Sequence, residues 1–327
     1  MPPSTAWEEI VAEGEQARFE EATARLIEIQ KSRSAKYGRG RALHRKGLLG
    51  LHATLDVLPD LVEHAAQGLF AKPATYEARV RLSNGGMEVA SDKRPDIRGF
   101  AIKVLGVEGE GTFGGPASSQ DFLLIDRSTF GFSRPEPFFE LLFAASKGVP
   151  AVIWHLLKTR GLFGGLRMLG ELTQDRFRGF AHETFFSAAP IACGRHAVRV
   201  RLVPTAREGE GPAVRKDDLS ADIIERLAAG PLEYRLQLQF FVDEARTPIE
   251  DAAVDWAEAD APYVDVARLV VGKQAPTGTE GATLADEIET LKFDPWSALA
   301  AHRPLGSIMR ARKVAYLASQ NARAEKD

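Results

Sequence analysis

Cysteine is nearly absent from this sequence, with Cys193 as the single copy among 327 residues. One thiol cannot form an intramolecular disulfide or a multi-cysteine zinc site, which excludes a disulfide-stapled secreted scaffold and a zinc ribbon. The amino terminus carries acidic residues where a signal peptide needs Lys or Arg. We therefore expect no export and a location in the reducing cytoplasm.

Long apolar runs and an excess of charge of one sign are also missing. The apolar stretch 149–157 falls well short of the ~18 residues that a membrane span needs. The 42 Lys and Arg nearly balance the 45 Asp and Glu, and a net charge of −3 gives no strong field toward nucleic acid. The basic run 33–46 lacks a pattern of interleaved aromatic residues. We expect no membrane span and no nucleic-acid partner.

Common catalytic signatures are missing as well. The sequence contains no GxGxxG, GxxxxGKS/T, HExxH or GxSxG motif, and no internal repeat or low-complexity tract. A nucleotide cofactor and the common hydrolase mechanisms therefore have no support.

Hydrophobic patterning, in contrast, is clear and indicates a mixed fold. Residues 7–31 place apolar side chains at helical spacing among glutamates, which predicts an amphipathic helix that packs, for example, against a partner subunit. A basic, glycine-containing loop is expected over 31–47. The predicted strands are 48–57, 76–82, 100–107, 122–126, 197–203, 232–242 and 263–271, and the predicted helical regions are 135–174, 284–291 and 304 onward.

The first four predicted strands follow one another too closely to leave room for crossover helices, so antiparallel pairing is expected. The whole pattern is typical of an α+β fold: an antiparallel β-barrel of about eight strands with inserted and appended α-helices.

Two short segments each gather several chemically functional residues. The first holds Arg41 and His44 and leads into a predicted strand; the second holds Arg312, Tyr316 and Arg323 on the last helix. Residues four apart share a helix face, so Arg312 lies one turn from Tyr316, and Arg323 returns to the same side. A phenol is a poor anionic ligand at neutral pH unless a cation lies against it, and Arg312 is placed to supply that cation.

These segments resemble the motifs of the haem-dependent catalases and of their smaller catalase-like relatives. The Arg-x-x-His segment at 41–44 is similar to the family's distal motif. Val80-Arg81-Leu82-Ser83 and the segment 92–103, DKRPDIRGFAIK, are similar to its next two strands, and 312–323 reproduces the R-x-x-x-Y spacing with a further Arg. The matches occur in the family's order along the chain.

The resemblance implies a cofactor and a set of roles. Haem b would be ligated through Tyr316, which is thereby the metal ligand, and Arg312 would hold the tyrosinate charge. His44 would be the distal acid and base, oriented by Ser83. The remaining cofactor-binding residues would be Arg41, Arg81 and Arg323 at the haem propionates and Phe130 over the haem face.

Two departures from the family pattern bear on function. The family's distal Asn is replaced by Ser119 or Gln120, which we count with His44 and Ser83 as catalytic candidates; loss of the amide is expected to weaken dismutation more than peroxidase turnover. The chain is also well short of a typical catalase, so a more open haem is expected to admit bulky hydroperoxides or organic reductants.

The sequence thus predicts a haem peroxidase that reduces hydrogen peroxide or organic hydroperoxides, using an unknown organic reductant and forming a homo-oligomer such as a dimer. It comprises an N-terminal helix or arm, 1–33, and one haem-binding domain, 34–327. The alternatives are a non-catalytic haem- or lipid-binding module and a fatty-acid hydroperoxide isomerase of the allene-oxide-synthase type. The latter carries Thr before its distal His, whereas Leu43 stands here.

Overall fold

A closed antiparallel β-barrel forms the centre of the computed structural model, which describes residues 3–174, 177–206 and 214–323. The last four residues of the expected domain 34–327 lie outside this part. The strands are β1 (Gly47–Val57), β2 (Thr75–Asn84), β3 (Arg98–Leu105), β4 (Ser119–Ile125), β5 (Phe185–Phe186), β6 (Ile191–Cys193), β7 (His196–Pro204), β8 (Leu232–Phe240) and β9 (Tyr263–Val271).

The short strand β5 closes the barrel. The sheet runs in the order β5-β4-β3-β2-β1-β9-β8-β7-β6, and β5 also pairs with β7. Phe186 faces Ile125 of β4, and Phe185 faces Leu202 of β7, so β5 bridges the two ends of the sheet. Eight strands therefore form the closed ring, and β6 extends β7 outside it. This confirms the expected α+β class and barrel.

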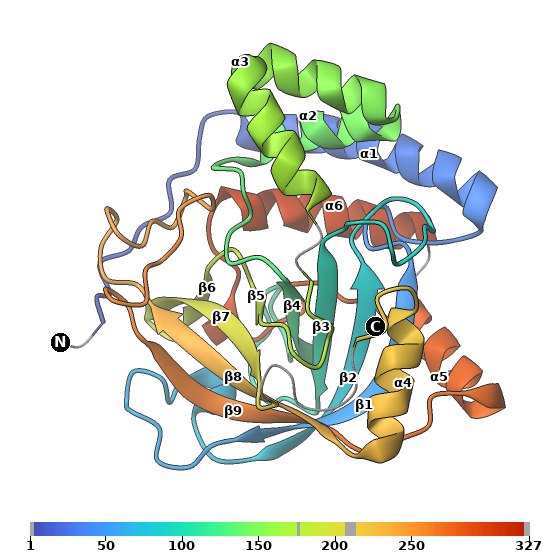
Figure 1. The fold of residues 1–327 in the computed structure, drawn as a ribbon. Helices are drawn as coiled ribbons and strands as arrows, with labels where there is room; N and C mark the ends of the chain where they lie inside the picture. Colours follow the sequence, from blue (N-terminus) through green and yellow to red (C-terminus); the bar gives the residue numbers. More distant parts are fainter. Residues whose placement is uncertain (1–2, 175–176, 207–213, 324–327) are drawn as a thin grey trace.

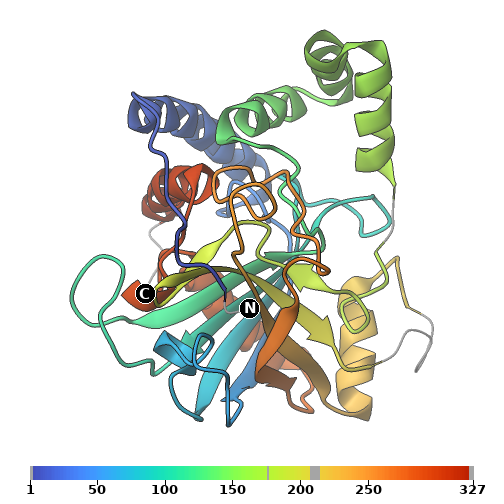
Figure 2. The same ribbon diagram turned by 90° about the vertical axis from the view of Figure 1, so that its left-hand side faces the viewer.

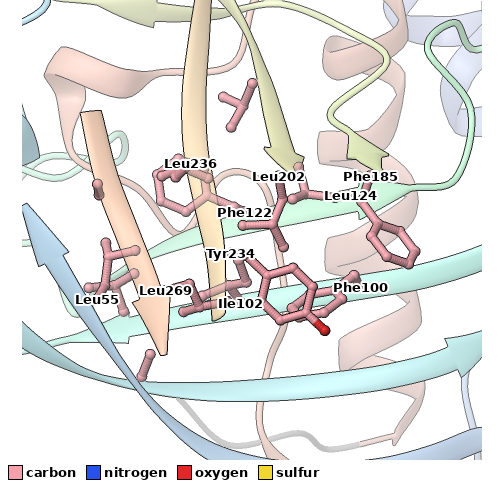
Figure 3. Close-up of a cluster of buried hydrophobic side chains, with 14 of the residues drawn as sticks. Leu55, Phe100, Ile102, Phe122, Leu124, Phe185, Leu202, Tyr234, Leu236 and Leu269 are labelled. Carbon is pink, nitrogen blue, oxygen red and sulfur yellow. The ribbon is translucent and has the colours of Figure 1, made fainter. Parts of the chain in front are cut away.

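Alternate residues of the strands fill the barrel interior, as the two-residue period of a strand requires. Large side chains such as Phe100, Phe185 and Tyr234 lie in contact there, and Figure 3 shows them pointing toward one another from different strands. Burying a side chain of this size contributes roughly 1.5–3 kcal/mol. The interior is thus packed, and functional side chains must lie on the outer face or at the ends.

In the part of the chain that the structure describes, six α-helices lie outside the barrel, four of them gathered at one end and two at another side (Figures 1 and 2). They are α1 (Glu15–Tyr37), α2 (Pro135–Ser146), α3 (Val149–Thr173), α4 (Leu219–Ala229), α5 (Gly278–Thr290) and α6 (Ser307–Arg323). Three of them form a second apolar cluster in which Phe19 and Leu26 of α1 pack against Phe139 and Phe143 of α2 and Ala311 of α6. The apolar stripe of α1 is therefore covered within the chain itself.

Helix α1 differs from the sequence expectation at both ends. It begins at Glu15, eight residues after the predicted start, and it continues to Tyr37 through the first part of the segment expected as a loop. Gly38 ends it because φ is 81° there, a conformation that glycine adopts without steric cost. The residues before it form an extended arm in which the Trp7 indole N–H donates to the carbonyl of Arg195.

Candidate active site

The candidate site lies on the outer face of the barrel. Val80, Leu82 and Phe122 point into the barrel core, so the residues between them point outward. Strand register places the outward residues side by side across β2, β3 and β4: Ser83 beside Gly99, Arg81 beside Ala101, and Lys103 beside Asp121. Most of the residues that the sequence singled out in these strands therefore share one surface.

His44 lies just before β1 and rests against this surface. Its Nδ1 is 3.0 Å from the hydroxyl oxygen of Ser83, as expected from the resemblance. Its backbone has a φ of 50°, which is uncommon for a non-glycine residue, and its N–H donates to the carbonyl of Gly85 at 2.9 Å. The contact with Ser83 orients the imidazole, and the backbone hydrogen bond to Gly85 fixes the position of the main chain at His44.

Gly99 leaves the space that the imidazole occupies. A Cβ at this position would lie 2.5 Å from Nδ1 of His44 and 2.7 Å from Oγ of Ser83. Both distances are too short for real carbon contacts. Gly99, which belongs to the matched segment 92–103, therefore leaves the room that the His44 imidazole needs.

The environment of His44 favours the neutral imidazole. Burial is the largest cause, and the positive charges of Arg81, Arg312 and Arg41 add to it, lowering the pKa of His44 to about 3. A neutral imidazole at physiological pH accepts a proton on one ring nitrogen and donates one from the other.

Helix α6 presents Arg312 and Tyr316 at this site. The guanidinium of Arg312 donates to the Tyr316 hydroxyl at 3.1 Å and lies 5.2 Å from the centre of its ring. The i to i+4 spacing produces this contact, as the sequence predicted. The charge of Arg312 also contributes to lowering the pKa of His44, so this part of α6 lies near the distal side of the barrel.

Three arginine side chains lie around the carboxylate of Glu289, close to His44. Both Arg41 and Arg81 pair with Glu289 at the end of α5; Arg81 Nε lies 2.6 Å from Oε1. Burial opposes ionisation of Glu289, but the charges of Arg81, Arg41 and Arg323 outweigh it, so the pKa of Glu289 is lowered. Arg81 also donates to the carbonyl of His44 at 2.9 Å. The cluster is thus built to hold a carboxylate.

Glu289 itself was not singled out by the sequence reasoning. Gly47 permits its approach, because a Cβ there would lie 2.3 Å from Oε1 of Glu289. Residues 284–291 read as an ordinary helix end, and no local pattern indicates a carboxylate aimed at arginines far away in the chain. A cavity of about 500 Å³ adjoins the cluster, and its lining includes Arg41, Glu289 and Arg323.

The two candidates for the distal amide position, Ser119 and Gln120, lie on opposite faces of β4. Gln120 shares the inward face with Phe122, and its side-chain oxygen accepts from the N–H of Leu299 at 3.1 Å. Ser119 points outward, where its hydroxyl donates to Asp121 at 2.7 Å and accepts from Lys103 at 2.8 Å. The structure therefore brings only Ser119 to the outer face.

Lys103 and Asp121 form a buried ion pair, 3.0 Å apart, at the far end of this face. Burial raises the pKa of Asp121 to about 6 even though Lys103 and Ser119 lower it. The second carboxylate oxygen accepts from the N–H of Asp294, whose own carboxylate accepts from Gln320 of α6 at 2.7 Å. These bonds tie the segment before α6 to the barrel. Lys103 belonged to the matched segment, but the role of Asp121 was missed.

Phe130 belongs to an aromatic group with Phe132 and Phe138. Its ring centre is 4.7 Å from that of Phe138 on α2 and 6.2 Å from that of Phe132. It is half-buried, and its backbone N–H donates to Ala252 at 3.0 Å.

Among residues 3–174, 177–206 and 214–323 no group of three His, Cys, Asp or Glu side chains has the geometry to hold a metal ion. In the same ranges, no helix is both long and apolar enough to cross a bilayer.

The chain has the fold of the catalases. It superposes on a fungal catalase with a TM-score of 0.67 and 17% identity, over 88% of this chain and 59% of the other. It superposes on a bacterial catalase with a TM-score of 0.68 and 18% identity, over 92% of this chain and 61% of the other. With catalase A from Saccharomyces cerevisiae the TM-score is 0.70 and the identity 15%, over 99% of this chain and 68% of the other. The chain thus spans about three fifths of the first two. No protein-family model and no curated protein matches it.

Proposed function

We propose that the protein is a haem b-dependent peroxidase that reduces hydrogen peroxide or organic hydroperoxides with weak dismutation. The observations that carry the proposal are two side-chain pairs on the outer barrel face and on α6: His44 is held by Ser83, and Tyr316 is held by Arg312, whose charge also acts on His44. The catalase fold of the chain supports it, because the sequence motifs that resemble that family fall on this surface.

The residues present fit the proposed cofactor. Haem b carries two carboxylates, and the cluster of Arg41, Arg81 and Arg323 already holds the carboxylate of Glu289. Guanidinium groups suit this task because they bind carboxylates with two parallel hydrogen bonds. The phenol oxygen of Tyr316 would be the protein ligand to the haem iron. Haem bound here would supply the iron at which the peroxide O–O bond is cleaved.

On the proximal side, Arg312 stabilises the phenolate form of Tyr316. The guanidinium donates a hydrogen bond to the hydroxyl oxygen at 3.1 Å. This bond strengthens when the oxygen becomes an anion, because the donor and the acceptor then carry opposite charges. The same guanidinium stays charged at every relevant pH. Arg312 would therefore support Tyr316 as the ligand to the iron without serving as a ligand itself.

On the distal side, His44 transfers a proton between the two peroxide oxygens. Its Nε2 accepts a proton only in the tautomer whose Nδ1–H donates to Ser83. The imidazole is then placed to give this proton to the far oxygen, and bound haem would supply the electrons for the O–O cleavage that releases water or an alcohol. A neutral resting imidazole suits this task, and the lowered pKa of His44 maintains it.

Weak dismutation follows from the surroundings of Ser119 and Gln120. The side-chain amide of Gln120 bonds to the backbone on the inward face, and the Ser119 hydroxyl is held between Lys103 and Asp121. Neither offers a free amide for positioning a second hydrogen peroxide. An organic reductant is therefore the proposed electron donor.

The proposal also covers location and organisation: the protein is cytoplasmic and forms a homodimer, and each chain comprises an N-terminal arm, 1–33, and one haem-binding domain, 34–327.

Haem-loaded protein tests the catalytic part of this proposal. Wild type is expected to react with hydrogen peroxide or cumene hydroperoxide and to oxidise a donor faster than it evolves oxygen. The variant His44→Ala should keep its haem spectrum and lose the peroxide reaction by about 100-fold or more, the usual contribution of a general acid–base group.

His52→Ala, which removes an exposed imidazole eight residues away, is the control and should react like wild type. If wild type binds haem but reacts with neither peroxide, the non-catalytic haem-binding module is the better description. Rearrangement of a fatty-acid hydroperoxide without oxidation of a donor would instead identify an isomerase.

A further inference from the structure

Helix α3 exposes a concentrated apolar surface. Six of the thirteen large apolar side chains that are exposed in the described residues fall between 149 and 166: Val149, Ile153, Trp154, Leu162, Phe163 and Leu166. Phe163 is 87% exposed and Trp154 is 71% exposed. Such clustering of exposed apolar side chains marks an interaction site.

Its charge identifies the kind of partner. Residues 141–170 contain Lys147, Lys158, Arg160 and Arg167 and no Asp or Glu, in a chain whose net charge is −3. Apolar and aromatic side chains interspersed with Lys and Arg, on a helix too polar to span a bilayer, are the pattern of helices that lie in a membrane interface. Acidic residues occur just outside this window, at Glu140 before α3 and at Glu171 near its end, so the exposed apolar side chains themselves lie in a basic segment.

The position and shape of α3 suit a flat surface. Figures 1 and 2 show α3 at one end of the molecule, with its second part standing clear of the barrel. Gly161, with a φ of 68°, bends the helix into two parts, and exposed apolar side chains occur on both: Ile153 and Trp154 before the bend, Leu162 and Phe163 after it. Leu156 is the buried anchor of the first part.

We propose that α3 docks the protein onto the surface of a phospholipid bilayer that carries anionic headgroups. Trp154, Leu162 and Phe163 insert among the acyl chains, and Lys158 and Arg160 contact the headgroups. Arg160 also lies 5.8 Å from the Phe132 ring, so the docking surface adjoins the aromatic group of Phe130. The proposal is independent of the haem chemistry.

Sedimentation with vesicles tests it. The full-length protein is expected to bind vesicles that mix phosphatidylcholine with phosphatidylglycerol and to bind pure phosphatidylcholine vesicles much more weakly. Raising the salt concentration should weaken the first interaction, since it screens the charges. The double variant Lys158→Gln/Arg160→Gln should lose about 25-fold in affinity for the anionic vesicles, at about fivefold for each basic residue.

The apolar part is tested by Trp154→Ser/Phe163→Ser, which should reduce binding to the same vesicles by about tenfold or more. Phe113→Ser and Lys72→Gln are matched controls, because both residues are exposed and lie outside α3; they should bind like wild type. Thermal unfolding of each variant verifies that it is folded.

Equal binding of wild type to neutral and anionic vesicles, or no binding to either, would overturn the proposal. A dimer in light scattering that Trp154→Ser/Phe163→Ser converts to a monomer, without vesicle binding by wild type, would also overturn it. That result would assign the surface to contact between copies of this chain.

Discussion

At the residue scale, the site depends on small groups that leave space and on charges that act over a few ångströms. Gly99 makes room for His44, and Gly47 makes room for Glu289. Burial is the main cause of the lowered pKa of His44, and Arg41 and Arg81, which pair with Glu289, lower it further. Sequence motifs revealed the histidine and the arginines but could not reveal Glu289, because the two arginines that pair with it, Arg41 and Arg81, are more than 200 residues away.

The pKa of His44 gives a prediction with a definite sign. The folded-state pKa, about 3, lies below the ordinary 6.5, so the unfolded chain binds more protons between these values. Stability contributed at His44 is therefore complete above pH 6.5 and is lost as the pH falls toward 3, by at most about 1.4 kcal/mol per pH unit. NMR titration of the haem-free protein should show His44 still neutral at pH 5.

The matched comparison is His44→Gln, whose unfolding free energy should fall less steeply than that of wild type between pH 6 and about pH 4. His302 is also buried with a lowered pKa, and it contributes equally to both proteins. An imidazole resonance of His44 that titrates near its ordinary value would contradict this description of the site.

Gly99→Ala is expected to displace the imidazole. The new methyl group would overlap with Nδ1 of His44 and Oγ of Ser83, and relief of such a clash typically costs about 1–3 kcal/mol. We predict a lower unfolding free energy and a slower peroxide reaction with haem still bound. Gly230→Ala is the control, since no atom lies within 4 Å of the added carbon. Equal effects of the two substitutions on the peroxide reaction would contradict the claim that Gly99 leaves the space for the His44 imidazole.

At the element scale, the consecutive helices α5 and α6 bring residues from the end of the chain to strands formed near its beginning. Residues before α6 are tied to β4 through Asp121 and Asp294, and α6 is tied to the N-terminal arm because Arg310 pairs with Glu9 and Glu15. Strand alternation predicted the long strands well: the expected segment 263–271 coincides with β9. It missed β5 and β6, which are too short for a periodic signal.

Helix α5 yields a prediction about cofactor affinity. Its Glu289 holds Arg41 and Arg81, the groups proposed to bind the haem carboxylates, so it competes with haem for them. Glu289→Gln removes the competing charge and is expected to tighten haem binding by about tenfold, the equivalent of roughly 1.4 kcal/mol. Spectroscopic titration with haemin measures this.

Glu287→Gln, two residues away and facing Arg79 instead, is the control for a general charge effect. A weaker affinity for haem in Glu289→Gln than in Glu287→Gln would mean that Glu289 supports the bound cofactor and does not compete with it.

At the scale of the whole molecule, residues from both ends of the chain meet at one surface of one barrel. His44 and Arg41 come from the first sixth of the sequence, whereas Arg312 and Tyr316 come from the last helix. The order of the motifs along the sequence predicted that these residues lie near one another, because a closed barrel brings segments that are distant in the sequence together. The docking surface of α3 was not predicted, since its pattern in the sequence equals that of a buried helix and only the fold leaves it uncovered.

The most direct test of the account is the absorption spectrum of the haem-loaded protein compared with that of Tyr316→Phe. Wild type is predicted to show the spectrum of ferric haem with a tyrosinate ligand, and Tyr316→Phe to lose that spectrum and most of its haem affinity. Retention of haem by Tyr316→Phe with an unchanged spectrum would contradict the account, because some other residue would then be the ligand.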